Sequence, residues 1–252
     1  MVTTNRIVWV MVVVYLCIGG WLYVIGPIAQ DTSYHVFRDQ RGWRGVPNVW
    51  NIFSNIPFLV IAVMALLAMR RRRLVVVKRL QWLYGLFFAA VALVAFGSGY
   101  YHWAPNNDSL LWDRLPMSIA FMTLFCVVVG EYVSVSWAIK LAFPLVAFGV
   151  CSVVYWFISE SYGQGDLRLY VLVQFLPLLW LPMFLWFFSP TFSHSYTYWG
   201  ILVAYAVSKA CEYLDADIYA LGLGVSGHTL KHLVIALGLM FLLRGYFRRS
   251  AV

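Results

Sequence analysis

The feature that most constrains this chain is a series of long apolar runs. A helix needs about 20 apolar residues to cross a bilayer core about 30 Å thick, and runs of that length recur along the 252 residues. They lie at 7–29, 50–69, 80–103, 111–130, 136–158, 167–189, 197–214 and 219–243. With 63% hydrophobic and 11% charged residues, the chain has too little polar surface to cover a soluble globule. We therefore predict an all-α integral membrane protein.

The distribution of charge predicts how these runs are oriented. The densest basic cluster, Arg70–Arg73 with Lys78 and Arg79, falls in a short loop between two runs, which is typical of the cytoplasmic side. An even number of crossings then places both termini in the cytoplasm. The acidic loop residues gather on the opposite side: Asp31, Asp39, Asp108, Glu160, Asp166, Asp215 and Asp217. The net charge of +8 is thus explained by membrane anchoring, and no nucleic-acid partner is expected.

Two further patterns bear on the class of membrane protein. All four cysteines lie in apolar runs without C-x-x-C spacing, so neither a disulfide framework nor a thiolate zinc site is expected. The first run is longer than the apolar region of a signal peptide, and Pro27 interrupts the cleavage pattern, so this run is predicted to be a retained helix. No internal repeat or long linker divides the rest, which predicts one helical bundle.

Ionisable and polar side chains inside membrane spans are unfavourable in free energy, and they commonly face a cavity or one another. Ser98 and His102 end the third run one helical turn apart, which places them on one face. Only residues 103–110 separate His102 from the next run, so Asp113 should return to about the same depth. A carboxylate is therefore predicted beside a histidine.

The last run contains His228 and His232, an H-x-x-x-H pair on one helix face with the spacing that lets two imidazoles bind one metal. Under the predicted topology His102 lies in the same half of the membrane and can supply a third ligand. A helix starting at residue 219 would place the pair roughly 13 to 20 Å deep, below His102. Because glycines interrupt this region, we expect the regular helix to begin near Val225.

Three neutral imidazoles with an open fourth position form a catalytic zinc site. Asp113 could then accept a proton from water, and Ser98 could donate a hydrogen bond to the oxyanion. A nucleophilic role for Ser98 would need a free histidine base. Taken alone, each feature has an explanation that involves no catalysis. An isolated H-x-x-x-H occurs by chance, and a serine in a span commonly forms a hydrogen bond within its own helix. The prediction rests on their convergence.

These residues are shared with a known family. Ser98-x-x-x-His102, the downstream Asp113 and His228-x-x-x-His232 resemble the pattern of the alkaline ceramidases, which belong to a superfamily that includes the progestin and adiponectin receptors. Residues 113–117 look like the family's D-x-L-P-M, and residues 50–55 look like its W-N-x-x-S-N. The resemblance covers residues 31–243. It implies seven transmembrane helices, zinc on the three histidines, and hydrolysis of ceramide to sphingosine and fatty acid.

The resemblance also divides the chain. Residues 1–30 become an extra N-terminal transmembrane helix, 31–243 a seven-helix ceramidase-like domain, and 244–252 a basic cytoplasmic tail. Relatives bind calcium through acids before W-N-x-x-S-N, but here that segment offers mainly Asp31, Asp39 and Asn48, with Asn48 where a glutamate is expected. Calcium prefers several carboxylates, so Ca²⁺ regulation is not carried over.

The remaining polar residues are expected to be structural. Lys209 and Glu212 are predicted to pair on the seventh run, and pairing is also the favoured role of Lys231. His35 and His194 are expected at the surface.

The leading hypothesis is a zinc-dependent amidase whose ceramide-like lipid enters from the bilayer and reacts in the non-cytoplasmic half. The alternative is a zinc-containing receptor of the adiponectin or progestin type, which short cytoplasmic loops disfavour. A proton or metal transporter would need polar residues through the whole membrane depth, whereas these cluster in one half.

Overall fold

A computed structural model describes residues 4–252, and their regular structure is helical apart from two isolated β-bridges. The helices are α1 (Thr4–Ile25), α2 (Val49–Phe53), α3 (Ile56–Arg70), α4 (Gln81–Trp103), α5 (Asn107–Tyr132), α6 (Val135–Ser161), α7 (Arg168–Phe187), α8 (Tyr196–Tyr213), α9 (Asp215–Ala220) and α10 (Gly227–Arg248). Short 3-10 helices occupy Thr32–His35 and Lys78–Leu80. The predicted all-α class is confirmed.

Six segments of the described chain are long and apolar enough to cross a membrane: Val49–Arg70, Lys78–Trp103, Asn107–Tyr132, Val135–Ser161, Arg168–Phe187 and Gly227–Arg248. The chain is therefore a multi-pass membrane protein by length and composition. In α1 the apolar part is the shorter segment Trp9–Ile25. α8 is also not one of the six, because its 18 residues include Lys209, Glu212 and several tyrosines. The predicted count of seven helices plus one stays a prediction.

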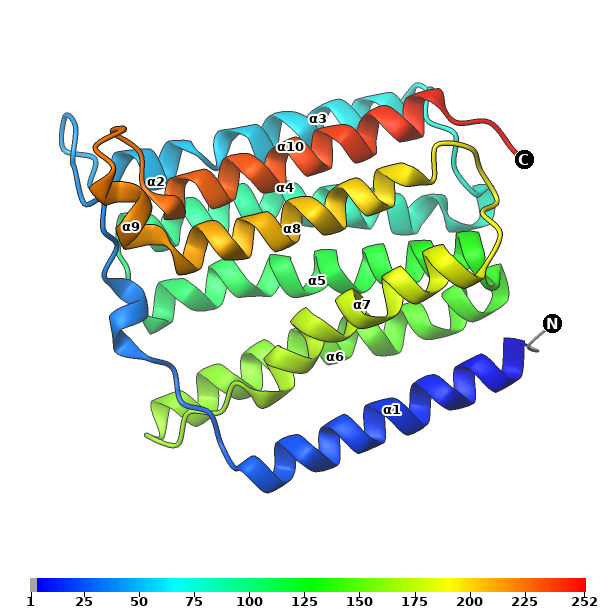
Figure 1. Ribbon diagram of the computed structural model, residues 1–252, viewed down its shortest axis with the longest axis horizontal. Helices are drawn as coiled ribbons and strands as arrows, with labels where there is room; N and C mark the ends of the chain where they lie inside the picture. The colour runs from blue at the N-terminus through cyan, green and yellow to red at the C-terminus, as the bar shows by residue number, and fades with distance from the viewer. Residues whose placement is uncertain (1–3) are drawn as a thin grey trace.

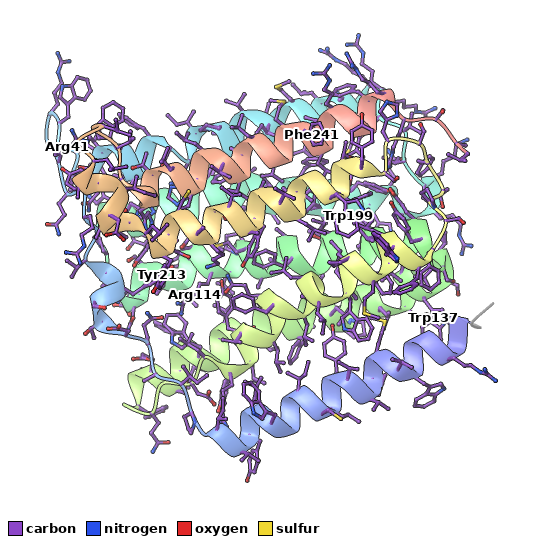
Figure 2. All side chains as sticks on the ribbon, in the orientation of Figure 1. Arg41, Arg114, Trp137, Trp199, Tyr213 and Phe241 are labelled. Carbon is purple, nitrogen blue, oxygen red and sulfur yellow. The ribbon has the colours of Figure 1, made fainter. Side chains whose placement is uncertain are left out.

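The long helices run side by side, with α8 between α10 and α7 and with α1 at the outer edge (Figure 1). The described start of α1 and the C-terminus lie at one end of the bundle, and α9 lies at the other end (Figure 1). Large apolar side chains such as Trp199 and Phe241 remain exposed on the outside (Figure 2). Such a surface suits contact with lipid better than contact with water.

Local sequence explains where the helices begin. α5 starts at a capping box in which Asn106 Oδ1 accepts from the Ser109 backbone N–H, 2.9 Å away, directly after Pro105. Ser134 caps the start of α6 and Ser226 caps the start of α10, and each side chain accepts from a backbone N–H of the first turn.

The predicted eighth run is divided in two. α9 ends at Ala220, a turn follows in which Gly222 and Gly224 take positive φ angles of 71° and 74°, and α10 begins at Gly227. Glycine adopts such angles without steric cost. A start at residue 219 is therefore wrong for the regular helix, and the expectation of a later start near Val225 is within two residues of the structure. This late start raises the histidine pair toward the end of the bundle.

Candidate metal centre and adjoining cavity

Three histidines from two helices meet at the end of the bundle that carries α9. His102 comes from the last turn of α4, and His228 and His232 come from the first two turns of α10. Their ligand nitrogens lie within 4.8 Å of one another, and their side chains are buried. The ring centroids are 4.8 Å apart for His102 and His228, and 5.1 Å for His102 and His232. The structure thus brings together all three predicted ligands.

The unpaired nitrogens of this cluster fit a metal ion. Within the described chain, both ring nitrogens of His102 and Nε2 of His228 are buried without a hydrogen-bond partner. Buried polar atoms are normally paired, because leaving them unpaired costs free energy. Three neutral imidazoles suit zinc, which binds nitrogen ligands tetrahedrally and keeps a fourth position open in catalytic sites. The buried histidine cluster could therefore hold a metal ion.

A serine fixes the third imidazole. Ser54, between α2 and α3, places its Oγ 2.8 Å from Nδ1 of His232. That contact leaves Nε2 of His232 available to the cluster, which is how hydrogen bonds around a metal site set the orientation of a ligand. Ser54 belongs to the W-N-x-x-S-N segment, whose role the sequence alone did not explain.

The same segment ties the two ligand helices together. Asn48 Nδ2 donates to the backbone oxygen of His102 over 2.9 Å, and Asn51 Oδ1 accepts from Thr229 Oγ1 over 2.9 Å. The buried Asn51 also donates to the backbone oxygen of Asp39. Both ligand helices are therefore held by α2 and its flanking residues.

The loop before α2 covers the histidines. The ring of Phe37 lies 4.7 Å from that of His102 and 4.6 Å from that of His228, centroid to centroid. Phe37 was not predicted from the sequence, because it lies in a loop without periodicity. Arg41 secures the loop with an ion pair to Asp39 (2.7 Å) and a hydrogen bond to the Gly224 backbone oxygen (2.5 Å). Hydrogen bonds from Arg41 hold the pKa of Asp39 below its usual range.

Ser98 and Asp113 line a cavity of about 310 Å³ beside His232. A close helix crossing positions them, since a Cβ added at Gly97 of α4 would overlap the backbone oxygen of Trp112 in α5. The residues after Gly97 and Trp112 are Ser98 and Asp113, and both are buried. The predicted serine and carboxylate therefore share one cavity with His232, one member of the histidine cluster.

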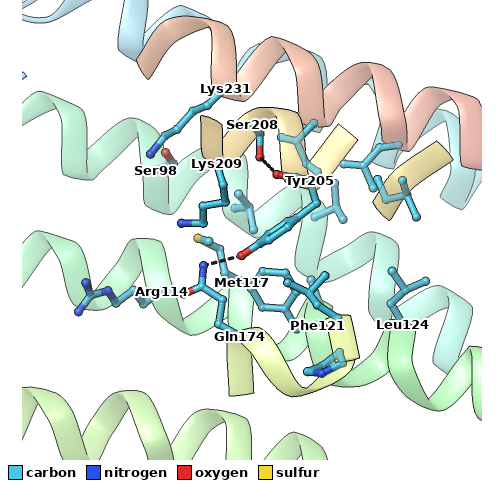
Figure 3. A pocket seen from close by; sticks show the side chains of 18 of the residues that line it. Ser98, Arg114, Met117, Phe121, Leu124, Gln174, Tyr205, Ser208, Lys209 and Lys231 are labelled. Carbon is cyan, nitrogen blue, oxygen red and sulfur yellow. Dashed lines mark hydrogen bonds between the residues drawn. The ribbon is translucent and has the colours of Figure 1, made fainter. Parts of the chain in front are cut away.

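One end of the cavity is polar and the other is apolar (Figure 3). In Figure 3, Ser98, Arg114, Lys209 and Lys231 lie toward one end, and Phe121 and Leu124 lie toward the other. The polar lining also includes Asp113, Glu212 and His232, and the apolar lining includes Val94, Leu178, Leu202 and Leu239. On their helices, Asp113, Glu212 and His232 lie within a turn of the labelled polar residues, which places them at the same end. Between them Gln174 donates to Tyr205 over 2.7 Å (Figure 3). Residues 113 to 124 of α5 span about 16 Å at about 1.5 Å per residue. These dimensions suit an acyl chain.

The predicted pair of Lys209 and Glu212 is confirmed, with 2.6 Å between Lys209 Nζ and Oε2. Lys231 also binds Glu212, through Oε1 at 2.6 Å. His35 differs from the expectation of a surface residue, because it is half-buried and contacts Tyr101 Oη and Asn107 Oδ1 at 3.0 Å each.

The residues considered as possible calcium ligands form other contacts in the structure. Asp31 Oδ1 accepts from the Ser33 backbone N–H, and Asp39 is paired with Arg41. Asn48, where a glutamate was expected, turns its amide nitrogen to the backbone of α4. That calcium regulation does not carry over stays a prediction.

A scan against protein-family models found no matching family, and a search of curated proteins found no similar sequence. The class that fold and site define is a multi-pass helical membrane protein with a buried three-histidine cluster at the polar end of an amphipathic cavity.

Proposed function

We propose that this protein is a zinc-dependent amidase embedded in the membrane, which hydrolyses ceramide or a related N-acyl lipid to an amine and a fatty acid. One observation carries the proposal: the histidine cluster adjoins a cavity that has a polar end and an acyl-sized apolar end. The resemblance of Ser98, His102, Asp113, His228 and His232 to the alkaline ceramidase pattern supports it.

The proposed reaction uses side chains of the polar end. His102, His228 and His232 would hold zinc, which would supply Lewis acidity toward a carbonyl and toward water. The carboxylate of Asp113 accepts a proton from the attacking water and delivers it to the departing nitrogen as the C–N bond breaks. The hydroxyl of Ser98 donates a hydrogen bond to the carbonyl oxygen as that atom gains negative charge. Water is consumed, and the products are a carboxylic acid and an amine.

The fold supports a route for the substrate. The apolar end of the cavity lies among α4, α5, α7, α8 and α10, where residues such as Leu124 and Leu239 would contact a chain that enters sideways from the bilayer. In this proposal α8 and α1 also cross the membrane, which gives seven helices plus an N-terminal one. Both termini are cytoplasmic, and the reaction occurs in the non-cytoplasmic half.

The test is fatty-acid release by the purified, detergent-solubilised, zinc-loaded protein from ceramide and from a panel of other N-acyl lipids. We expect release by the wild type, none by His228→Ala, and wild-type rates for His194→Ala, which removes a histidine outside the cluster. Absence of release from every lipid would reject the amidase and favour a receptor of the adiponectin or progestin type, in which the same cavity binds a ligand without turnover.

A further inference from the structure

The polar end of the cavity contains more cationic than anionic side chains. Lys209, Lys231 and Arg114 face only two carboxylates, those of Glu212 and Asp113. Both lysines contact Glu212: Oε2 lies 2.6 Å from Lys209 Nζ, and Oε1 lies 2.6 Å from Lys231 Nζ. With both carboxylates ionised, the three cations and two carboxylates of the polar end leave one net positive charge, and the three neutral imidazoles beside them add no negative charge.

These cations have unused hydrogen-bond donors. Each ammonium has three N–H groups, and the structure gives each lysine one acceptor, on Glu212. Figure 3 shows Lys231 reaching toward Ser98 from α10 and Lys209 reaching toward α5. Both lysines therefore direct donors to the region where a lipid head group would lie.

Arg114 also has an unused hydrogen-bond donor. Its Nη2 donates to Gln30 Oε1 over 2.5 Å, its Nη1 has no partner in the described part of the chain, and only 6% of the residue is exposed. The guanidinium lies over the Trp156 ring, 4.3 Å from the centroid. None of the ion pairs formed within residues 4–252 includes Arg114.

An excess of positive charge in a largely apolar membrane cavity is costly, and an anionic ligand offsets that cost. We propose that the lipid amide bound here has a carboxylate in its head group, as in an N-acyl amino acid, and that Lys209 and Lys231 bind this carboxylate. The assignment of the ligand as an amide rests on the proposed function. Lys231 and His232 both line the polar end of the cavity, so the carboxylate would lie near the amide while the acyl chain fills the apolar end.

The test measures binding without turnover. The host is the full-length His228→Ala protein, which keeps every charged side chain of the cavity. Affinities are measured by displacement of a fluorescent fatty-acyl probe by N-dodecanoylglycine, by N-dodecanoylethanolamine and by dodecanoate. The first two ligands have the same chain and amide, and they differ in the head-group carboxylate. Dodecanoate has a carboxylate on the acyl carbon itself and represents the product.

We expect N-dodecanoylglycine to bind about tenfold more tightly than the ethanolamide, a preference typical of a partly buried charge pair. Lys209→Met should reduce the preference to about threefold or less, while Lys209→Arg and the exposed Lys140→Met should keep it. Lys209 is the first choice because Lys231 still pairs with Glu212 in the variant, and size-exclusion profiles verify folding.

Equal affinity for the two amides would overturn the proposal, as would a preference unchanged by Lys209→Met. Tight binding of dodecanoate that depends on Lys209, without a preference between the amides, would assign the lysines to the fatty-acid product and would also overturn it. Because binding is measured in a variant without turnover, a carboxylate preference remains interpretable if the wild type hydrolyses no lipid. A carboxylate preference in the variant, together with no hydrolysis by the wild type, would reject the amidase alone.

Discussion

Ser54 Oγ lies 2.8 Å from Nδ1 of His232, and the two residues are 178 positions apart in the chain. Both groups are buried, so no bulk water competes for this contact. The contact selects which imidazole nitrogen faces His102 and His228. Ser54 therefore contributes to the candidate metal centre without being one of its possible ligands.

Replacing Ser54 by alanine should weaken zinc binding about 10- to 100-fold, the range typical for loss of a hydrogen bond to a metal-ligating histidine. Competition with a zinc-binding dye in detergent measures the affinity, and the exposed Ser161→Ala is the matched control. An unchanged affinity in Ser54→Ala, together with a loss in His228→Ala, would show that the contact does not orient the ligand.

Zinc should stabilise the folded protein through the histidine cluster. A ligand present at about 100 times its Kd adds about 2.7 kcal/mol to the free energy of unfolding. We expect zinc to raise the Tm of the wild type and of His194→Ala, and a chelator to reverse the rise. His102→Ala should not respond, because it lacks the unpaired imidazole nitrogens of His102 that are available to a metal. An equal zinc response in His102→Ala would place the metal elsewhere.

Gly97 allows the crossing that brings Ser98 toward Asp113, and its replacement by alanine should be destabilising. The added Cβ would meet the Trp112 backbone, which cannot move as a flexible side chain would. Overpacking of this kind costs about 1–3 kcal/mol. Gly99→Ala is the control, because nothing lies within 4 Å of a Cβ at that position of the same helix. Thermal unfolding in detergent should show a lower Tm for Gly97→Ala alone.

The arrangement of the ligands was predictable because the bilayer removes most alternatives. An apolar run of about 20 residues must be helical, and alternating direction then fixes which ends share a depth. His102 and His228 could therefore be placed together from topology. The unusual glycines near residue 224 even indicated the late start of α10.

The parts that sequence reasoning missed depend on irregular segments and long side chains. Phe37 reaches the histidines from a loop, where no periodicity indicates which residue faces inward. Ser54 lies at the junction of two helices, where a turn decides its direction. Arg249, assigned to a basic tail, instead folds back into the bundle and is 5% exposed. A flexible side chain of that length can reach a buried partner that sequence spacing does not reveal.

That partner is Glu131, 2.8 Å away at the opposite end of the bundle from the histidines, with both side chains 3% exposed. Breaking a buried pair by removing one partner costs about 3–5 kcal/mol. Arg249→Met should therefore lower the Tm strongly, while the exposed Arg248→Met should not.

Adding Glu131→Gln to Arg249→Met should recover most of the loss, because glutamine keeps an acceptor for Tyr84 without a buried charge. Zinc affinity should stay at the wild-type value in each folded variant, given the distance of this pair from the cluster. A further loss of Tm in the double variant would contradict the ion-pair explanation.

The ion pair of Asp39 and Arg41 should make the free energy of unfolding depend on pH in the acid range. Hydrogen bonds from Arg41 lower the pKa of Asp39 in the folded protein, whereas the unfolded chain has the ordinary value of about 3.9. The stabilisation is therefore fully present above that ordinary pKa, and it is lost as pH falls through the lower folded value.

Asp39→Asn removes this titration, so its Tm should fall less than that of the wild type between about pH 5 and pH 3. Arg41→Met should behave similarly, because without the guanidinium the pKa of Asp39 returns toward its ordinary value. At neutral pH both variants should be less stable than the wild type, since the loop that carries Phe37 loses its attachment. Thermal unfolding across a pH series measures all three proteins, and parallel pH profiles would show that this pair does not contribute to folding.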